Sequence, residues 1–160
     1  MNPPIDPTLL QPGDLLVFSR RGLFDWIIKV KTWSQATHTE LYIGNNKTLA
    51  ARNGQGAAMY GLDLTGLYMV LRPQQPFDLV AATSTFYANW NRKPYGWLAL
   101  FSFVLIDLHD MGVFCSELST LLYRAGKFEP FRKWIEADKV APADYTYTAD
   151  AVMKAVWTLF

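Results

Sequence analysis

The chain has 160 residues, of which 51% are hydrophobic and 18% charged, and its formal net charge is +1. This length and composition are typical of one globular domain with its own core, so we expect a single domain over residues 1–160. The near-neutral charge provides no basic surface for nucleic acid, which we exclude as a partner. The single cysteine excludes an internal disulfide framework and a cysteine-rich zinc site.

The first residues predict no secretory signal, and the apolar runs predict no membrane span. Residues 1–7 contain no basic segment followed by an apolar one, so we expect synthesis in the cytoplasm without a signal peptide. The longest apolar run, residues 97–106, is about half as long as the roughly 20 residues of a spanning helix. We expect a buried helix there, with a helix on a membrane surface or against a partner as the alternative.

The first half of the chain is divided into short apolar runs by glycine-rich turns. An amphipathic helix is expected over residues 23–33, and residues 44–47, Gly-Asn-Asn-Lys, predict a hairpin turn. The runs should form one antiparallel sheet. The expected strands are residues 13–19, 38–44, 48–52, 57–62 and 67–72.

The second half of the chain has mainly helical patterns. In the first of these helices, Phe77, Val80, Ala81, Ser84 and Tyr87 are expected on one side. Thr148 would be the N-cap of the last one. The expected helices are residues 77–90, 97–106, 115–125, a short piece at 131–136, and 148–160. Strands followed by helices indicate the α+β class, with an antiparallel sheet packed against helices.

Cys115 begins the helix expected over residues 115–125. Its apolar positions repeat at helical spacing from Cys115 through Leu118 and Leu122 to Ala125. A thiol in the first turn is close to unpaired N–H groups and to the positive end of the helix dipole, and both favour the nucleophilic thiolate. The same pattern also fits a small buried thiol in a core helix.

His38 is the candidate base for such a nucleophile. With a period of two, His38, Glu40 and Tyr42 share one polar face of their strand, and the opposite face is apolar. Glu40 could then orient the imidazole and stabilise its charged form. The backbone N–H of Cys115 would be one oxyanion donor, and no second donor is identified. The alternative is a strand-end histidine beside a solvated carboxylate.

Several other residues could take part in the site. His109 lies six residues before the cysteine in a polar turn, where a solvent-exposed role is expected. Glu117 is expected to complement the helix dipole. Tyr42, Tyr95 and Trp97 are candidates for substrate contacts in a cleft, and core positions are the alternative for these aromatic residues.

Four segments occur in a characteristic order: Gly13-Asp-Leu-Leu-Val-Phe18, His38-Thr-Glu-Leu-Tyr-Ile-Gly44, Lys93-Pro-Tyr95 and Phe114-Cys-Ser-Glu-Leu118. Together they resemble the motifs of the YiiX-like peptidases, the circularly permuted branch of the NlpC-type, papain-like superfamily. The resemblance covers about residues 12–145, including a late motif at 141–144. It implies a papain-like α+β fold in which the histidine strand precedes the cysteine helix.

The resemblance also implies roles for individual residues, with Cys115 as the nucleophile and His38 as the general base. The family position that would orient the histidine falls near Ala50, which cannot do so. Glu40 is therefore the candidate third residue. Further candidates for this role are Asn53 and Gln55.

A second departure from the family pattern is Gly96, which stands where the family tends to have an acidic residue after Tyr95. This departure concerns the positioning of the substrate. Together with Ala50, it motivates a reading in which the fold serves as a binding module without turnover.

The function expected from these residues is that of a cysteine hydrolase, a peptidase or amidase. The thiolate would attack an amide or ester carbonyl, and water would release the acyl-enzyme, with no need for a metal or organic cofactor. The resemblance implies a peptide amide of the bacterial cell wall as substrate, which would require delivery to the cell envelope. The alternative within the same fold is an acyltransferase or thioesterase that acts on lipid-linked esters or amides at a membrane surface.

Overall fold

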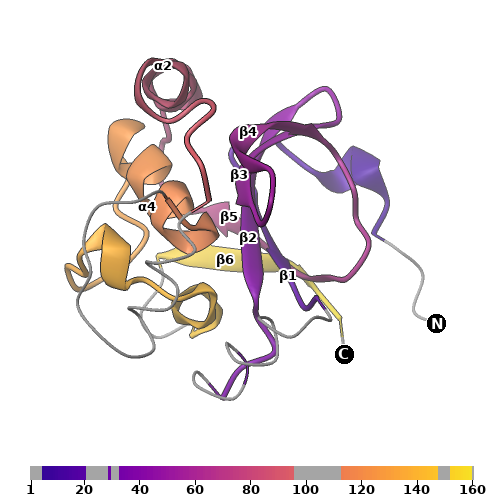
Figure 1. Ribbon diagram of the computed structural model, residues 1–160. Coiled ribbons are helices and arrows are strands. Elements are labelled where there is room, and N and C mark those ends of the chain that lie inside the picture. The colour runs from indigo at the N-terminus through magenta and orange to yellow at the C-terminus, as the bar shows by residue number, and fades with distance from the viewer. Residues whose placement is uncertain (1–4, 21–28, 30–32, 96–112, 148–151, 160) are drawn as a thin grey trace.

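The computed structural model describes residues 5–20, 29, 33–95, 113–147 and 152–159. Within these ranges the protein is α+β, with a six-stranded antiparallel sheet in the order β4-β3-β2-β1-β5-β6. Helices α2 and α4 lie on one side of this sheet, and the N-terminal segment lies on the other (Figure 1). The predicted class and the antiparallel sheet packed against helices are thereby confirmed.

The first five strands follow the predicted order closely. The strands are β1 (Leu15–Phe18), β2 (His38–Gly44), β3 (Lys47–Arg52), β4 (Gly56–Gly61), β5 (Leu67–Pro73) and β6 (Met153–Thr158). The helices are α2 (Leu79–Asn89) and α4 (Cys115–Ala125), and short 3-10 turns are η1 (Pro7–Leu9), η2 (Ala137–Lys139) and η3 (Pro142–Thr146).

The turn between β2 and β3 is the predicted hairpin. Its two central residues, Asn45 and Asn46, have φ angles of 50° and 53°. Two left-handed residues give the turn the twist that joins antiparallel strands, and asparagine adopts this conformation more easily than most residues. This tight connection places β3 directly beside the strand that carries His38.

The predicted helix at residues 148–160 is wrong, because residues 153–158 form strand β6. This strand pairs with β5, with Leu71 opposite Ala155 and Val70 opposite Trp157. Its burial alternates at first, from buried Met153 to exposed Lys154. The dense apolar residues of this segment fit either period, and the open edge of β5 selects the strand.

Two other helical predictions need correction. Residues 131–136 form no helical turn; the 3-10 turn η2 follows them, and Phe131 is buried in the core. Helix α2 is present but buries Ala82 and Phe86, whereas Val80 and Tyr87 from the predicted face are exposed. The predicted helix at 97–106 lies outside the described residues, as does that at 23–33 apart from its residues 29 and 33.

Both faces of the sheet are covered, and the face shared by His38, Glu40 and Tyr42 carries buried polar residues at its start and the buried Tyr42 further along. One core cluster lies between the sheet and the helices and contains Leu41, Leu118 and Leu122. The other lies on the opposite face beneath the N-terminal segment. It contains Ile5, Leu10, Leu16, Phe18, Tyr42, Leu67 and Val70. Glu40 is fully buried on β2, where polar side chains contact its carboxylate.

Candidate functional site

Helix α4 begins at Cys115, as its apolar spacing predicts. Phe114 has extended backbone angles, and its N–H donates to the carboxylate of Glu117 at 3.3 Å. A carboxylate in the first turn accepts a hydrogen bond from an N–H group that the helix start leaves unpaired, and its negative charge interacts favourably with the positive end of the helix dipole. This is the role expected of Glu117. Cys115 therefore occupies the first helical position and is 3% exposed.

Polar side chains attach the cysteine helix to strand β2. The hydroxyls of Thr39 and Ser119 are 3.0 Å apart and buried. The ladder between β2 and β3 ends at Leu41 opposite Leu49, before it reaches Thr39. The backbone N–H groups of Thr39 and Ser116 donate to the sulfur of Cys115. Thr39 thus pairs with Val17 of β1 on one side, and its N–H on the other side is available to the cysteine instead of β3.

His38 and Cys115 form a buried pair in which each favours the charged form of the other. Burial lowers the pKa of His38, but the charge and hydrogen bond of Cys115, with the contribution of Glu40, raise it above its usual value overall. Burial raises the pKa of Cys115, but His38 and the backbone donors lower it below that of an ordinary thiol overall. The raised pKa of His38 and the lowered pKa of Cys115 both favour a thiolate–imidazolium pair.

Glu40 holds the far side of the imidazole ring. Nε2 of His38 lies 3.0 Å from Oε1 of Glu40, so the nitrogen left to face Cys115 is Nδ1. The role predicted for Glu40 requires this contact. The other two candidates for that role, Asn53 and Gln55, have side chains that lie exposed in the turn between β3 and β4. The carboxylate that contacts the imidazole therefore comes from the same strand as the histidine.

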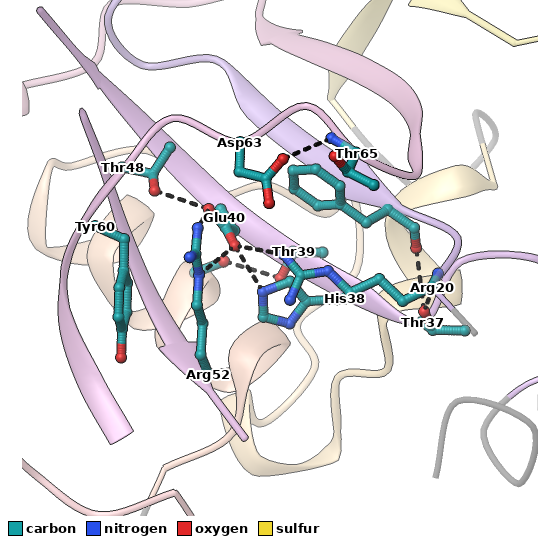
Figure 2. Close-up of polar contacts among 12 residues, drawn as sticks. Arg20, Thr37, His38, Thr39, Glu40, Thr48, Arg52, Tyr60, Asp63 and Thr65 are labelled. Carbon is teal, nitrogen blue, oxygen red and sulfur yellow. Dashed lines mark hydrogen bonds and ion pairs between the residues drawn. The ribbon is translucent and has the colours of Figure 1, made fainter. Parts of the chain in front are cut away.

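Several cations and one hydroxyl surround the Glu40 carboxylate (Figure 2). Arg52 donates to both oxygens at 2.9 Å, Arg20 donates to Oε1 at 3.0 Å, and Thr48 donates to Oε2 at 2.7 Å. Burial raises the pKa of Glu40, but hydrogen bonds from His38, Arg52 and Thr48 lower it overall to about 2. Glu40 therefore stays ionised at neutral pH and can hold a proton on Nε2 without taking it.

Sequence reasoning missed the partners of Glu40. Thr48 and Arg52 flank Ala50 on β3, and a period of two puts all three on one face of that strand. The small Ala50 cannot itself bind His38, but its two neighbours bind the carboxylate that does. The alternation of Thr48, Ala50 and Arg52 was the available signal.

The three aromatic residues predicted to contact substrate, Tyr42, Tyr95 and Trp97, differ in their positions. Tyr42 is buried in the second core cluster, which is a structural position. Tyr95 is half-buried and forms a backbone bridge with Val113, two residues before Cys115. Trp97 lies outside the described residues, as do Gly96 and His109.

No protein-family model matches the chain, and no curated protein matches it either. In the part of the chain that the structure describes, no helix is long and apolar enough to cross a membrane. The described residues also contain no cluster of three or more His, Cys, Asp or Glu side chains that could hold a metal ion.

Proposed function

We propose that this protein is a cysteine hydrolase of the permuted papain-like type, with Cys115 as nucleophile, His38 as general base and Glu40 as the residue that orients His38. The order of elements supports the fold, because a strand with the histidine precedes a helix that starts at the cysteine, and this helix packs against the sheet. The four sequence motifs from Gly13 to Leu118 occur in the same order.

The observation that carries the proposal is the buried row Glu40–His38–Cys115. A base that is anchored on one nitrogen by a carboxylate ionised at neutral pH, and that contacts a thiol with the other, is the arrangement that nucleophilic cysteine catalysis needs. A merely structural buried cysteine has an apolar environment that raises its pKa, whereas the pKa of Cys115 is lowered.

In the proposed reaction the thiol proton moves to Nδ1 of His38, and the thiolate adds to the substrate carbonyl. The backbone N–H of Cys115, at the start of α4, would stabilise the resulting oxyanion. When the tetrahedral intermediate collapses, the imidazolium gives its proton to the leaving nitrogen or oxygen. Water, deprotonated by His38, then attacks the acyl-enzyme and releases the acid and the free thiol.

The substrate class proposed from the motif resemblance is a peptide amide of the cell-wall type. The alternative is an ester, thioester or amide carried by a lipid. The apolar segment that motivates this alternative, residues 97–106, lies outside the described residues. Both substrates would acylate the same sulfur.

Acyl-enzyme formation tests the proposed function. The intact protein would be incubated with p-nitrophenyl acetate, muropeptides and acyl-thioesters, and its mass measured after a rapid acid quench. We expect a single acyl adduct on Cys115 that is absent from Cys115→Ala and accumulates at least tenfold more slowly in His38→Ala. If no substrate acylates Cys115 faster than it acylates a cysteine peptide, the binding-module reading replaces the hydrolase.

A further inference from the structure

One of the two arginines at Glu40 holds both of its carboxylate oxygens. Nε of Arg52 donates to Oε1 and Nη2 donates to Oε2, each at 2.9 Å. Arg20 reaches the same carboxylate through Nη2 alone, at 3.0 Å from Oε1. A two-point contact from the planar guanidinium fixes the plane of the carboxylate, whereas a single contact leaves it free to rotate.

Arg52 is itself held in place from the neighbouring strand. Its guanidinium lies over the ring of Tyr60 on β4, 4.2 Å from the ring centroid. The hydroxyl of Tyr60 donates to the backbone oxygen of Gly56 at 2.7 Å, and Gly56 is the strand partner of Arg52. Figure 2 shows Tyr60 and Arg52 side by side, with Arg52 extending to Glu40. The side chain of Arg52 is only 17% exposed.

The contacts form a continuous path from β4 to the cysteine helix. Oε1 of Glu40 accepts from Nε of Arg52 and also lies against Nε2 of His38. The orientation of the Glu40 carboxylate therefore determines where Oε1 lies, and with it the position of Nε2 of His38. If the carboxylate rotated, Oε1 would leave Nε2, and the ring would lose the contact that directs its other nitrogen to Cys115.

We infer that Arg52 is a positioning residue for the proposed reaction: its two-point contact with Glu40 fixes the oxygen that holds Nε2 of His38, and so directs Nδ1 toward Cys115. Arg52 has this role only if Cys115 and His38 react as proposed above. Arg20 holds Oε1 alone and Thr48 holds Oε2 alone, whereas Arg52 holds both oxygens through one rigid group.

The charges that face the site come from several elements. Arg20 follows β1, and Asp63 follows β4 and interacts electrostatically with both arginines, whereas Tyr145 of η3 stays neutral because burial raises its pKa well above the usual value. A substitution that removes a charge changes this field as well as the geometry. Lysine keeps the positive charge and loses the planar two-point contact, so it separates the two effects.

The matched pair Arg52→Lys and Arg20→Lys tests the inference in the full-length protein. The readout is the rate of iodoacetamide labelling of Cys115 as a function of pH. In Arg52→Lys we expect the low-pH limb to move up by about one pH unit, which is roughly a tenfold loss of rate on that limb. In Arg20→Lys a single ammonium can replace the single contact, and the profile should stay within about twofold of wild type.

Controls distinguish positioning from charge and from folding. Arg124→Lys removes a similar bidentate contact, with Glu129, and a similar stacking contact, over Trp134, away from His38, and it should leave the profile unchanged. An unchanged Arg52→Lys profile beside an altered Arg52→Gln profile would show that only charge matters and would overturn the inference. A wild-type profile like that of an ordinary thiol would instead reject the proposed function itself.

A second variant is needed if Arg52→Lys does not fold, as judged by circular dichroism and thermal unfolding. Tyr60→Leu keeps the guanidinium and the carboxylate but removes the ring that supports Arg52. It should move the labelling profile in the same direction by a smaller amount, about threefold in rate. A folded Tyr60→Leu variant with the wild-type profile would count against the positioning role.

Discussion

His38 and Glu40 lie two residues apart on strand β2, and Nε2 of the imidazole lies 3.0 Å from Oε1 of the carboxylate. The proposed base and the carboxylate proposed to orient it thus come from one strand. The strand also supplies the Thr39 N–H that donates to the sulfur of Cys115. Three consecutive residues of β2 therefore contribute to the site.

Lowering the pH should reduce the free energy of unfolding by the part that depends on the charged Glu40 carboxylate. Its folded-state pKa is about 2, below its ordinary value of 4.5. A lowered pKa stabilises the folded state fully above the unfolded-state value, and this contribution is lost as the pH falls toward the folded-state value. The difference in unfolding free energy between wild type and Glu40→Gln should shrink by about 3 kcal/mol between about pH 6 and about pH 2.

Urea unfolding at several pH values would measure this difference. Gln11→Glu, a change at an exposed position, serves as a control for general acid effects because it adds a carboxylate away from the site. If the difference between wild type and Glu40→Gln stays constant over this pH range, the Glu40 carboxylate is not held in its charged form by the fold.

The hydrogen bond between Thr39 and Ser119 should anchor the cysteine helix to β2. Thr39→Val or Ser119→Ala alone leaves one buried hydroxyl without its partner, which should cost about 1–3 kcal/mol of unfolding free energy. The double variant leaves no unpaired hydroxyl, so its loss should be clearly smaller than the sum of the two. A double-mutant cycle by urea unfolding measures this coupling, and strict additivity would show that the two hydroxyls do not interact.

Two neighbouring glycines provide a matched test of the turn beside Arg52. Gly54 and Gly56 have φ angles of +74° and +80°, so alanine is strained at both. Alanine at Gly54 meets nothing within 4 Å, whereas at Gly56 its Cβ would lie 2.5 Å from the backbone oxygen of Lys93. Gly54→Ala should therefore cost about 1–2 kcal/mol.

Gly56→Ala should cost at least about 1 kcal/mol more, because the backbone at Lys93 must move away. Thermal unfolding of the two variants measures the difference. Equal losses would mean that the segment at Lys93 yields freely and does not fix the position of β4.

The sequence was most informative where structure is local. Alternating residues place His38 and Glu40 on one face of β2, the pair Asn45–Asn46 forms the hairpin, and helical spacing identifies α4 with Cys115 at its start. Each of these features depends on residues within a few positions of one another. The periods of strands and helices are enough to predict them.

The features that were missed depend on distant partners. Strand β6 is a strand because β5 offers it an edge roughly eighty positions earlier in the chain, which no local period reveals. Arg52 and Arg20 converge on Glu40 from two different elements. Tyr42 is buried because the N-terminal segment covers its face of the sheet. The polar residues on that face of β2 did not indicate that another segment packs against it.

The most direct test of the central claim is the rate of iodoacetamide labelling of Cys115 against pH, in wild type and in His38→Ala, with the ultraviolet absorbance of the thiolate as a second readout that does not depend on access to the sulfur. If Cys115 and His38 form a thiolate–imidazolium pair, the wild type should label fast and show thiolate absorbance near pH ~6. In His38→Ala the labelling rate at this pH should fall at least about tenfold. If both proteins label slowly and form thiolate only above about pH 8, as an ordinary thiol does, His38 does not activate Cys115 and the proposed hydrolase is contradicted.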